Sequence, residues 1–246
     1  MPAVPTGVEP EKADGTPAVR GESVAHAYQQ LRELIVRGRL APGSRIVESE
    51  IADRLGVSRT PARSALHRLQ TEGYVIVADR SKEHRLVIAP LTQHDARELF
   101  HIVGQLEGLA AREAAELPHE ARAELVSRLQ QLNADLAKVA RASRPDPMRI
   151  FDIDTAFHRA YVTGASGPRL LALHDAIKPQ SERYIRLYIS SLVDEIDMSV
   201  AEHAVIVGHI AAGDPLAAQA AVDTNWRNAA LRLRTVISTY GERGSW

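Results

Sequence analysis

Two short runs of side chains in this 246-residue chain carry groups that could do chemistry. In the first run, Asp154 and His158 lie four residues apart, so on a helix both side chains point to one face. A carboxylate and an imidazole placed in this way can bind a divalent metal, and His203 is a further candidate ligand. The alternative is a hydrogen-bonded or solvated pair with an ordinary core histidine, because short metal motifs are unspecific.

The second run holds two arginines, Arg59 and Arg63, near the start of a predicted helix. Ser58 is the candidate N-cap, since a serine hydroxyl can accept a hydrogen bond from an amide of the first turn. Gly73 is the candidate C′ residue, at which the helix ends. Four apolar residues repeat at helical spacing and predict a buried face on the side away from the arginines, namely Ala62, Ala65, Leu66 and Leu69. A short helix with paired arginines at its start fits the major groove of DNA.

The neighbouring segments predict the support for that helix. A short helix over 49–55 and the turn Gly56–Val57 precede it, which makes a helix-turn-helix. A longer helix is expected at about 23–37. Two β-rich runs, 74–78 and 85–89, flank a polar turn and predict a two-stranded wing, with basic side chains at or beside its tip at Arg80, Lys82 and Arg85.

From Leu91 onward the pattern is helical. Thr92 resembles the start of a capping box, and the helix after it is expected to turn Leu99, Ile102, Leu106, Leu109 and Ala110 inward. A later helix is expected to kink or split at Pro179. The spacing predicts an all-α antiparallel bundle of six or seven helices over about 92–115, 118–143, 148–163, 168–191, 193 or 199–212 and 215–238.

Composition bounds the class of protein. Residues 21–90 carry 11 Lys and Arg against 8 Asp and Glu (+3), whereas residues 91–246 carry 17 against 20 (−3). This small asymmetry fits a basic head on an acidic body. No cysteine is present, and no run approaches the ~20 apolar residues of a membrane span. We therefore expect a mainly α, cytoplasmic protein with a disordered tail (1–20), a winged helix-turn-helix domain (21–90) and an all-α domain (91–240).

The head resembles the winged helix of GntR-type transcription regulators. The resemblance covers roughly residues 23–90 and is carried by Leu-Ala-Pro-Gly-Ser-Arg-Ile at 40–46 and by Ile-Ala-Asp-Arg-Leu-Gly-Val-Ser-Arg-Thr-Pro, continuing through Arg63 and Ala65 to Leu69, at 51–69. It implies a recognition helix in the major groove and a wing that reaches the minor groove. The candidate DNA contacts are Arg45, Ser58, Arg59, Thr60, Arg63, Arg80, Lys82 and Arg85. The sequence departs from the family pattern at Ser49, Ala62 and Ser64, which leaves base preference open.

The second half resembles the FCD domain of the FadR-type branch of these regulators. The resemblance covers roughly residues 92–238 and is carried by Asp154-x-x-Phe-His, Gly164-x-x-Gly-Pro-Arg-Leu, Glu202-His-x-x-Ile and Ala212-Gly-Asp-Pro-x-Ala. Many members bind a metal through one aspartate and three histidines, with a small organic acid at or near the metal. Asp154, His158 and His203 match three of these ligands. Zn²⁺, Mn²⁺ or Ni²⁺ would suit such ligands better than Mg²⁺.

The resemblance is incomplete at two positions. Asn225 stands where the fourth ligand, a histidine, is expected, and an asparagine either coordinates weakly or marks a site that has lost its metal. Val103 stands where many members have an arginine, and valine cannot make the bidentate contact to a carboxylate that arginine makes. Further candidates for effector contact are Arg183, Arg186 and Trp226, which could instead be surface, dimer-contact or core residues.

These features predict a regulator rather than an enzyme. We expect a homodimer that binds a palindromic operator in double-stranded DNA, acts as a repressor and responds to a small-molecule effector, with no membrane partner. One alternative is a metal-dependent helical-bundle enzyme, although Glu202 and His203 are adjacent and not three residues apart as in the Glu-x-x-His motifs of di-iron bundles. The other is a DNA binder whose bundle only dimerises and senses no ligand.

Overall fold

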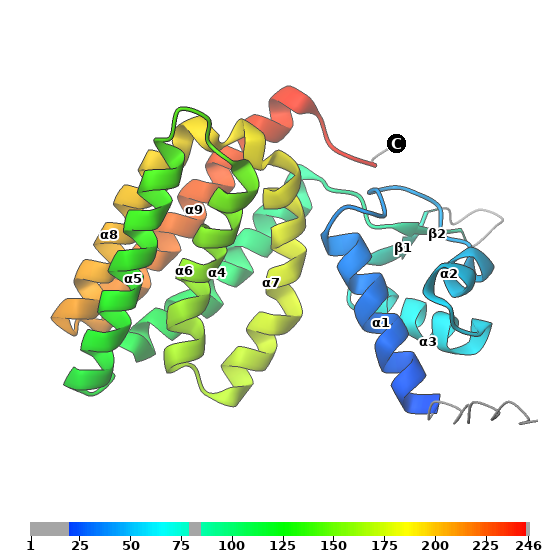
Figure 1. Ribbon diagram of the computed structural model, residues 1–246, viewed down its shortest axis with the longest axis horizontal. Coiled ribbons are helices and arrows are strands. Elements are labelled where there is room, and N and C mark those ends of the chain that lie inside the picture. Colours follow the sequence, from blue (N-terminus) through cyan, green and yellow to red (C-terminus); the bar gives the residue numbers. More distant parts are fainter. Residues whose placement is uncertain (1–19, 79–84, 245–246) are drawn as a thin grey trace, which may run out of the picture.

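The computed structural model describes residues 20–78 and 85–244, and in the first turn of the first helix only the backbone. It has a small head and a helical bundle lying side by side (Figure 1). The fold is mainly α, as the sequence predicts. Arg80 and Lys82 lie outside the described residues. Within the described part of the chain, no helix combines the length and the hydropathy that crossing a membrane requires.

The head is a three-helix unit with a wing. Its elements are α1 (Arg20–Val36), α2 (Glu48–Leu55), α3 (Arg59–Thr71), β1 (Val75–Val77) and β2 (Leu86–Ile88). The two strands pair antiparallel, with Val75 opposite Ile88. Gly56 ends α2 with φ of 64°, a conformation that glycine adopts without strain. The buried side chains come from all three helices and the strands, and include Leu31, Ile51, Ala62, Ala65, Leu66, Leu69 and Ile88.

The bundle contains six helices in the described residues. They are α4 (Gln93–Ala115), α5 (His119–Ala140), α6 (Pro147–Ala165), α7 (Pro168–Tyr188), α8 (Ile196–Ala212) and α9 (Pro215–Tyr240). Two short 3₁₀ turns, Ile189–Ser191 and Val193–Glu195, link α7 to α8. Local signals fix the helix starts, because Thr92, Asp146 and Asp214 each accept a hydrogen bond from a first-turn amide. Helix α7 continues through Pro179 without splitting.

The predicted inward face of α4 is right at Leu99 and Ala110, which are buried, and wrong at two other positions. Ile102 and Leu109 are 40% and 43% exposed, although the leucine pattern placed them inward. Where α4 faces α9 it carries small residues, and a Cβ added at Gly104 would lie 2.8 Å from Cβ of Trp226 on α9. The close approach of α4 and α9 therefore selects the glycine and alanine stripe over the leucine stripe.

Helix α7 and the residues after α9 join the two parts. Arg32 of α1 donates to the carbonyl of Asp175 (2.8 Å), and Gln180 donates to the carbonyl of Glu72 at the end of α3 (2.9 Å). The buried Arg183 donates to the carbonyl of Ala89, just after β2 (2.7 Å). Leu91 and Arg243 exchange two backbone hydrogen bonds. The head is thus held at the end of α3 and at the end of β2.

Candidate functional sites

The first candidate site is the outer face of α3. Ser58, Arg59, Thr60 and Arg63 are exposed at the start of this helix, and Arg45 and Arg85 are exposed beside β2. Ser58 occupies the N-cap position in extended conformation, but its side chain makes no capping hydrogen bond. Because the opposite face of α3 packs into the head, the arginines are held outward on a rigid element. The helix can therefore present them to a groove.

Arg63 is not a free cation in this structure. Its guanidinium contacts Glu48 at the start of α2, with Nε and Nη2 both 2.9 Å from Oε2. The arginine is largely exposed, so the pair contributes little to stability and exchanges easily with another anion. A phosphate or base edge would compete with Glu48 for the same group.

The second candidate site is a group of three ligands in the bundle. Asp154 and His158 project from α6 and His203 from α8, and one ligand atom of each lies within 4.8 Å of the others. Nε2 of His203 is 3.7 Å from Oδ1 of Asp154. Ligand atoms at about 2.1 Å from one tetrahedral zinc ion lie about 3.4 Å apart. Side-chain movements of less than an ångström would therefore bring the three onto one ion.

His203 is the unusual member of this group. It is fully buried, and neither ring nitrogen has a hydrogen-bond partner in the described structure. The imidazole stacks on Phe157 with centroids 3.9 Å apart, which fixes its plane. Burial, and then the neighbouring His158, lower the pKa of His203 well below its usual value, so the ring is held neutral. A neutral imidazole is the form that binds a metal, and a buried unpaired polar group costs about 1–3 kcal/mol.

His158 is oriented from behind by a buried carboxylate. Nδ1 of His158 lies 2.7 Å from Oε2 of Glu107 on α4 and 2.8 Å from the hydroxyl of Tyr161. When Nδ1 carries the proton that Glu107 accepts, Nε2 is left as a lone pair for a metal. Carboxylate–histidine contacts of this kind orient metal-binding imidazoles in many proteins. The residues present therefore fit a divalent metal.

Glu107 is the centre of a larger network. Its carboxylate is fully buried and accepts from five groups on three other helices, namely His158, Tyr161, His174, Lys178 and Trp226. Burial alone would raise the pKa of Glu107, but Lys178 and His158 outweigh it and hold the pKa well below its usual value. The carboxylate is therefore charged, and it ties α4 to α6, α7 and α9.

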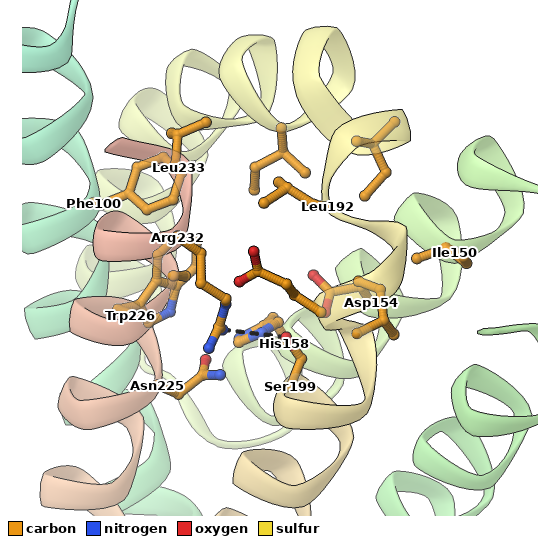
Figure 2. A pocket seen from close by; sticks show the side chains of 15 residues that line it. Phe100, Ile150, Asp154, His158, Leu192, Ser199, Asn225, Trp226, Arg232 and Leu233 are labelled. Carbon is orange, nitrogen blue, oxygen red and sulfur yellow. Dashed lines mark hydrogen bonds between the residues drawn. The ribbon is translucent and has the colours of Figure 1, made fainter. Parts of the chain in front are cut away.

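A cavity opens beside the ligand group. It has a volume of about 60 Å³ open to the centres of water molecules. Figure 2 shows His158, Ser199 and Asn225 at one side of it and Phe100, Leu192 and Leu233 at the other. Its lining comes from five helices and the turns between α7 and α8. The site is a small chamber with a polar end and an apolar end.

Asn225 and Arg232 both donate hydrogen bonds to the carboxylate of Glu202. Nδ2 of Asn225 donates to Glu202 (2.7 Å), and Arg232 contacts both oxygens of Glu202 at 2.9 and 3.1 Å. Burial would raise the pKa of Glu202, but these donors outweigh it and lower the pKa. Asn225 lines the cavity, and with Nδ2 directed to Glu202 only its carbonyl oxygen is left as a ligand atom.

The three residues predicted to contact the effector lie in different parts of the structure. Trp226 lines the cavity, whereas Arg183 lies against the head and Arg186 stacks on Phe151 with its guanidinium carbon 4.0 Å from the ring centroid. Sequence reasoning missed Glu107, Lys178 and Arg232. The one available signal was Glu107, a lone glutamate inside an apolar stretch of helix. A carboxylate in such a position is buried only when it is paired, so it indicates buried partners.

Comparison with known protein families gives two matches. Residues 23–82 match the model for bacterial regulatory proteins of the gntR family, and residues 98–228 match the FCD domain. The first match spans most of the head, and the second covers more than half of the chain and includes every residue of the ligand group.

Relatives and solved structures agree with these matches. The chain is 32% identical over 162 residues to an HTH-type transcriptional regulator of Agrobacterium vitis, covering 63% of this chain and 92% of the relative. It is 29% identical over 199 residues to a probable D-xylose utilization operon transcriptional repressor of Paenarthrobacter nicotinovorans, covering 78% and 82%. The fold resembles E. coli McbR/YncC (TM-score 0.66, 18% identity, 89% and 99% covered). It also resembles a putative GntR regulator of Rhodococcus sp. RHA1 (TM-score 0.64, 19% identity, 86% and 97% covered).

Proposed function

Because the chain belongs to the GntR family of bacterial regulatory proteins and carries an FCD domain, we propose that a metabolite bound in its bundle controls its hold on DNA. The chain is a DNA-binding transcription regulator, not an enzyme. The observation that carries the effector proposal is the buried, unpaired imidazole of His203 beside Asp154 and His158, at the polar end of a cavity. A divalent metal at these three residues would bind the carboxylate of a small organic acid.

On the DNA side, α3 enters the major groove. Arg59 and Arg63 contact bases or phosphates, Thr60 contacts a phosphate, and Ser58 and Arg45 lie beside them. Arg80, Lys82 and Arg85 of the wing follow the backbone or minor groove. A dimer presents two such heads, so its operator is a palindrome with half-sites on one face of the duplex. This activity places the protein in the cytoplasm, with the chromosome.

The dimer uses the outer face of α4 and α9. Ile102 and Leu109 lie seven residues apart on α4 and are exposed, and so is Leu231 on the adjacent α9. A second copy would cover these apolar side chains, whose exposure in a monomer is unfavourable. Repression is the direction we expect, as the name of the Paenarthrobacter relative states for that protein.

In the bundle, Asp154, His158 and His203 hold the metal, with the carbonyl oxygen of Asn225 as a weak fourth ligand. When bound, Zn²⁺, Mn²⁺ or Ni²⁺ supplies the positive charge that attracts the acid. Glu107 keeps Nδ1 of His158 occupied and turns Nε2 toward the site. Phe157 holds the plane of His203.

Helix α7 is the route from this site to the head. Lys178 and His174 contact Glu107, and Gln180, two residues beyond Lys178, contacts the end of α3. A ligand that moves His158 and Glu107 would shift α7 and, with it, the recognition helix. Such a ligand changes operator affinity only if it binds one arrangement more tightly than the other.

The metal site is tested by elemental analysis of protein purified without chelator. We expect about one divalent ion per chain, and loss of that ion in His203→Gln. The matched control, His119→Gln, changes an exposed histidine at the start of α5 and should keep the ion. Equal metal content in the two variants would remove His203 from the proposed site.

The reading head is tested by gel-shift titration at fixed salt. Arg59→Ala should weaken specific operator binding by about 1–3 kcal/mol if Arg59 reads a base. Arg149→Ala, an exposed arginine on α6, is the control and should bind as the unmodified protein does. Unchanged affinity of the Arg59→Ala protein would exclude Arg59 from the DNA interface.

A further inference from the structure

The chamber beside the ligand group has mostly apolar walls. Nine of its lining residues carry hydrocarbon or aromatic side chains, from α4, α6, α7, α8, α9 and the turns between α7 and α8: Phe100, Ile150, Ile185, Ile189, Leu192, Ile196, Trp226, Ala229 and Leu233. Such walls cannot hydrogen-bond hydroxyl groups, and burying an unpaired hydroxyl is costly. The part of a ligand that extends away from His158 is therefore selected to be apolar.

The charges at the chamber also restrict a ligand. Its charged lining residues are Asp154, Glu195 and Arg232. The one cation among the lining residues that the structure describes, Arg232, is already neutralised by Glu202, which contacts two of its nitrogens. Lys178, the nearby buried ammonium, is paired with Glu107, with Nζ 3.0 Å from Oε1. Among the described lining residues no cation is left over for a ligand.

We propose that the effector is a monocarboxylate with a compact, apolar remainder, and not a dicarboxylate, tricarboxylate or polyhydroxylated acid. This inference rests on the proposed function, because a divalent metal at Asp154, His158 and His203 keeps one net positive charge after the charge of Asp154 is subtracted, and that is the charge the ligand meets. One carboxylate is neutralised there. A second carboxylate would be buried against Glu195 and apolar walls without a counter-charge, which is strongly unfavourable.

The size of the chamber limits the remainder. A volume of about 60 Å³ for water centres holds roughly four to six waters at about 10–15 Å³ each. A short branched acid would displace these waters, and a long acyl chain would not fit. Binding of an alkyl group is favourable because it removes apolar surface of both the ligand and the chamber walls from contact with water.

The test compares two acids of the same shape, 4-methylpentanoate and succinate. The isopropyl end of the first has the same number of non-hydrogen atoms as the second carboxylate of succinate, so the pair differs in polarity and charge. A third probe, 2,3,4-trihydroxybutanoate, tests hydroxyl groups. Binding is measured by calorimetry and by thermal shift on the full-length, Zn²⁺-loaded protein. We expect 4-methylpentanoate to bind at least tenfold more tightly than either other acid.

Two variants assign the selectivity to the chamber. Glu195→Gln should strengthen succinate binding severalfold and leave 4-methylpentanoate unchanged, with Asp194→Asn, an exposed neighbour, as the control. Leu192→Asn should weaken 4-methylpentanoate about tenfold, whereas Leu173→Asn, at a side chain that is 59% exposed, should not. Failure of both variants to change selectivity would show that the acids bind elsewhere.

The results of these experiments distinguish three properties: the ligand preference, metal binding and DNA binding. Tighter binding of succinate or of the hydroxy acid, or binding of none of the three to protein that holds zinc and operator DNA, overturns the inference and leaves the regulator intact. Protein that takes up no metal at His203 overturns the metal-dependent effector site itself. Protein that binds no operator overturns the DNA-binding proposal, whatever acid it prefers.

Discussion

Replacing Glu107 with glutamine should destabilise the bundle more than any other change that preserves side-chain shape. Glutamine has one acceptor oxygen and one amide nitrogen in place of two acceptors. The five donors around Glu107 would then face a single acceptor and a competing donor. The ammonium of Lys178, only 7% exposed as a side chain, would lose its counter-charge.

The magnitude follows from that stranded charge. Removing one partner of a buried ion pair costs about 3–5 kcal/mol. For a chain of this length, such a loss lowers the melting temperature by on the order of 10 °C. Glu113→Gln, an exposed glutamate on the same helix, is the control and should change the free energy of unfolding by less than about 0.5 kcal/mol.

A double-mutant cycle with Lys178→Met tests the reason for the loss. Methionine has a similar shape and no charge, so the double variant leaves no buried ammonium. We expect Glu107→Gln to cost less in the Lys178→Met background, with a coupling of about 2 kcal/mol in urea unfolding followed by circular dichroism. Additivity within about 0.5 kcal/mol, or a Glu107→Gln protein as stable as its control, would refute the account of this network.

Three further changes test other parts of the structure. Gly104→Ala should lower the free energy of unfolding by about 1–3 kcal/mol, because its new methyl group overlaps Trp226, and thermal melting followed by tryptophan fluorescence would detect both effects; unchanged melting would contradict the close approach of α4 and α9. Glu48→Ala should tighten DNA binding a fewfold by releasing Arg63, since an exposed ion pair holds it by only about 0.2–1 kcal/mol, and weaker binding in a gel shift would show that Glu48 positions Arg63 instead. Gln180→Ala should remove about 1 kcal/mol of head–bundle contact and speed proteolysis between the two parts, whereas an unchanged cleavage rate would exclude that contact from holding the head.

Most of the fold could be predicted because its signals are local. The starts of α4, α6 and α9 are marked by Thr92, Asp146 and Asp214, and each caps its helix by contacts within three residues. The inward face of α4 could not be predicted in the same way. Leucine spacing favoured Ile102 and Leu109, but the separation of α4 from α9 is a property of the packed pair, and only residues as small as Gly104 permit it.

In the candidate site, too, the local contacts could be predicted and the long-range contacts could not. Asp154 and His158 share one helix turn, so their proximity follows from spacing. His203 was added by its motif, and the structure brings it within reach of both. Glu107 and Lys178 are 71 residues apart, and only the packing of α4 against α7 joins them. Nothing local predicts a pair of that kind, and this is why the network behind the ligand group was missed.

The placement of α7 has a consequence for hybrid regulators. A chimaera that joined this head to a foreign bundle at Pro90 would preserve the covalent linker and discard the contacts of Asp175, Gln180 and Arg183 with the head. In such a chimaera each half would fold, but ligand binding in the bundle would no longer change the DNA affinity of the head. A transplantable sensor therefore has to bring matching α7 residues with it, so the boundary that matters for exchange is a surface and not a point along the chain.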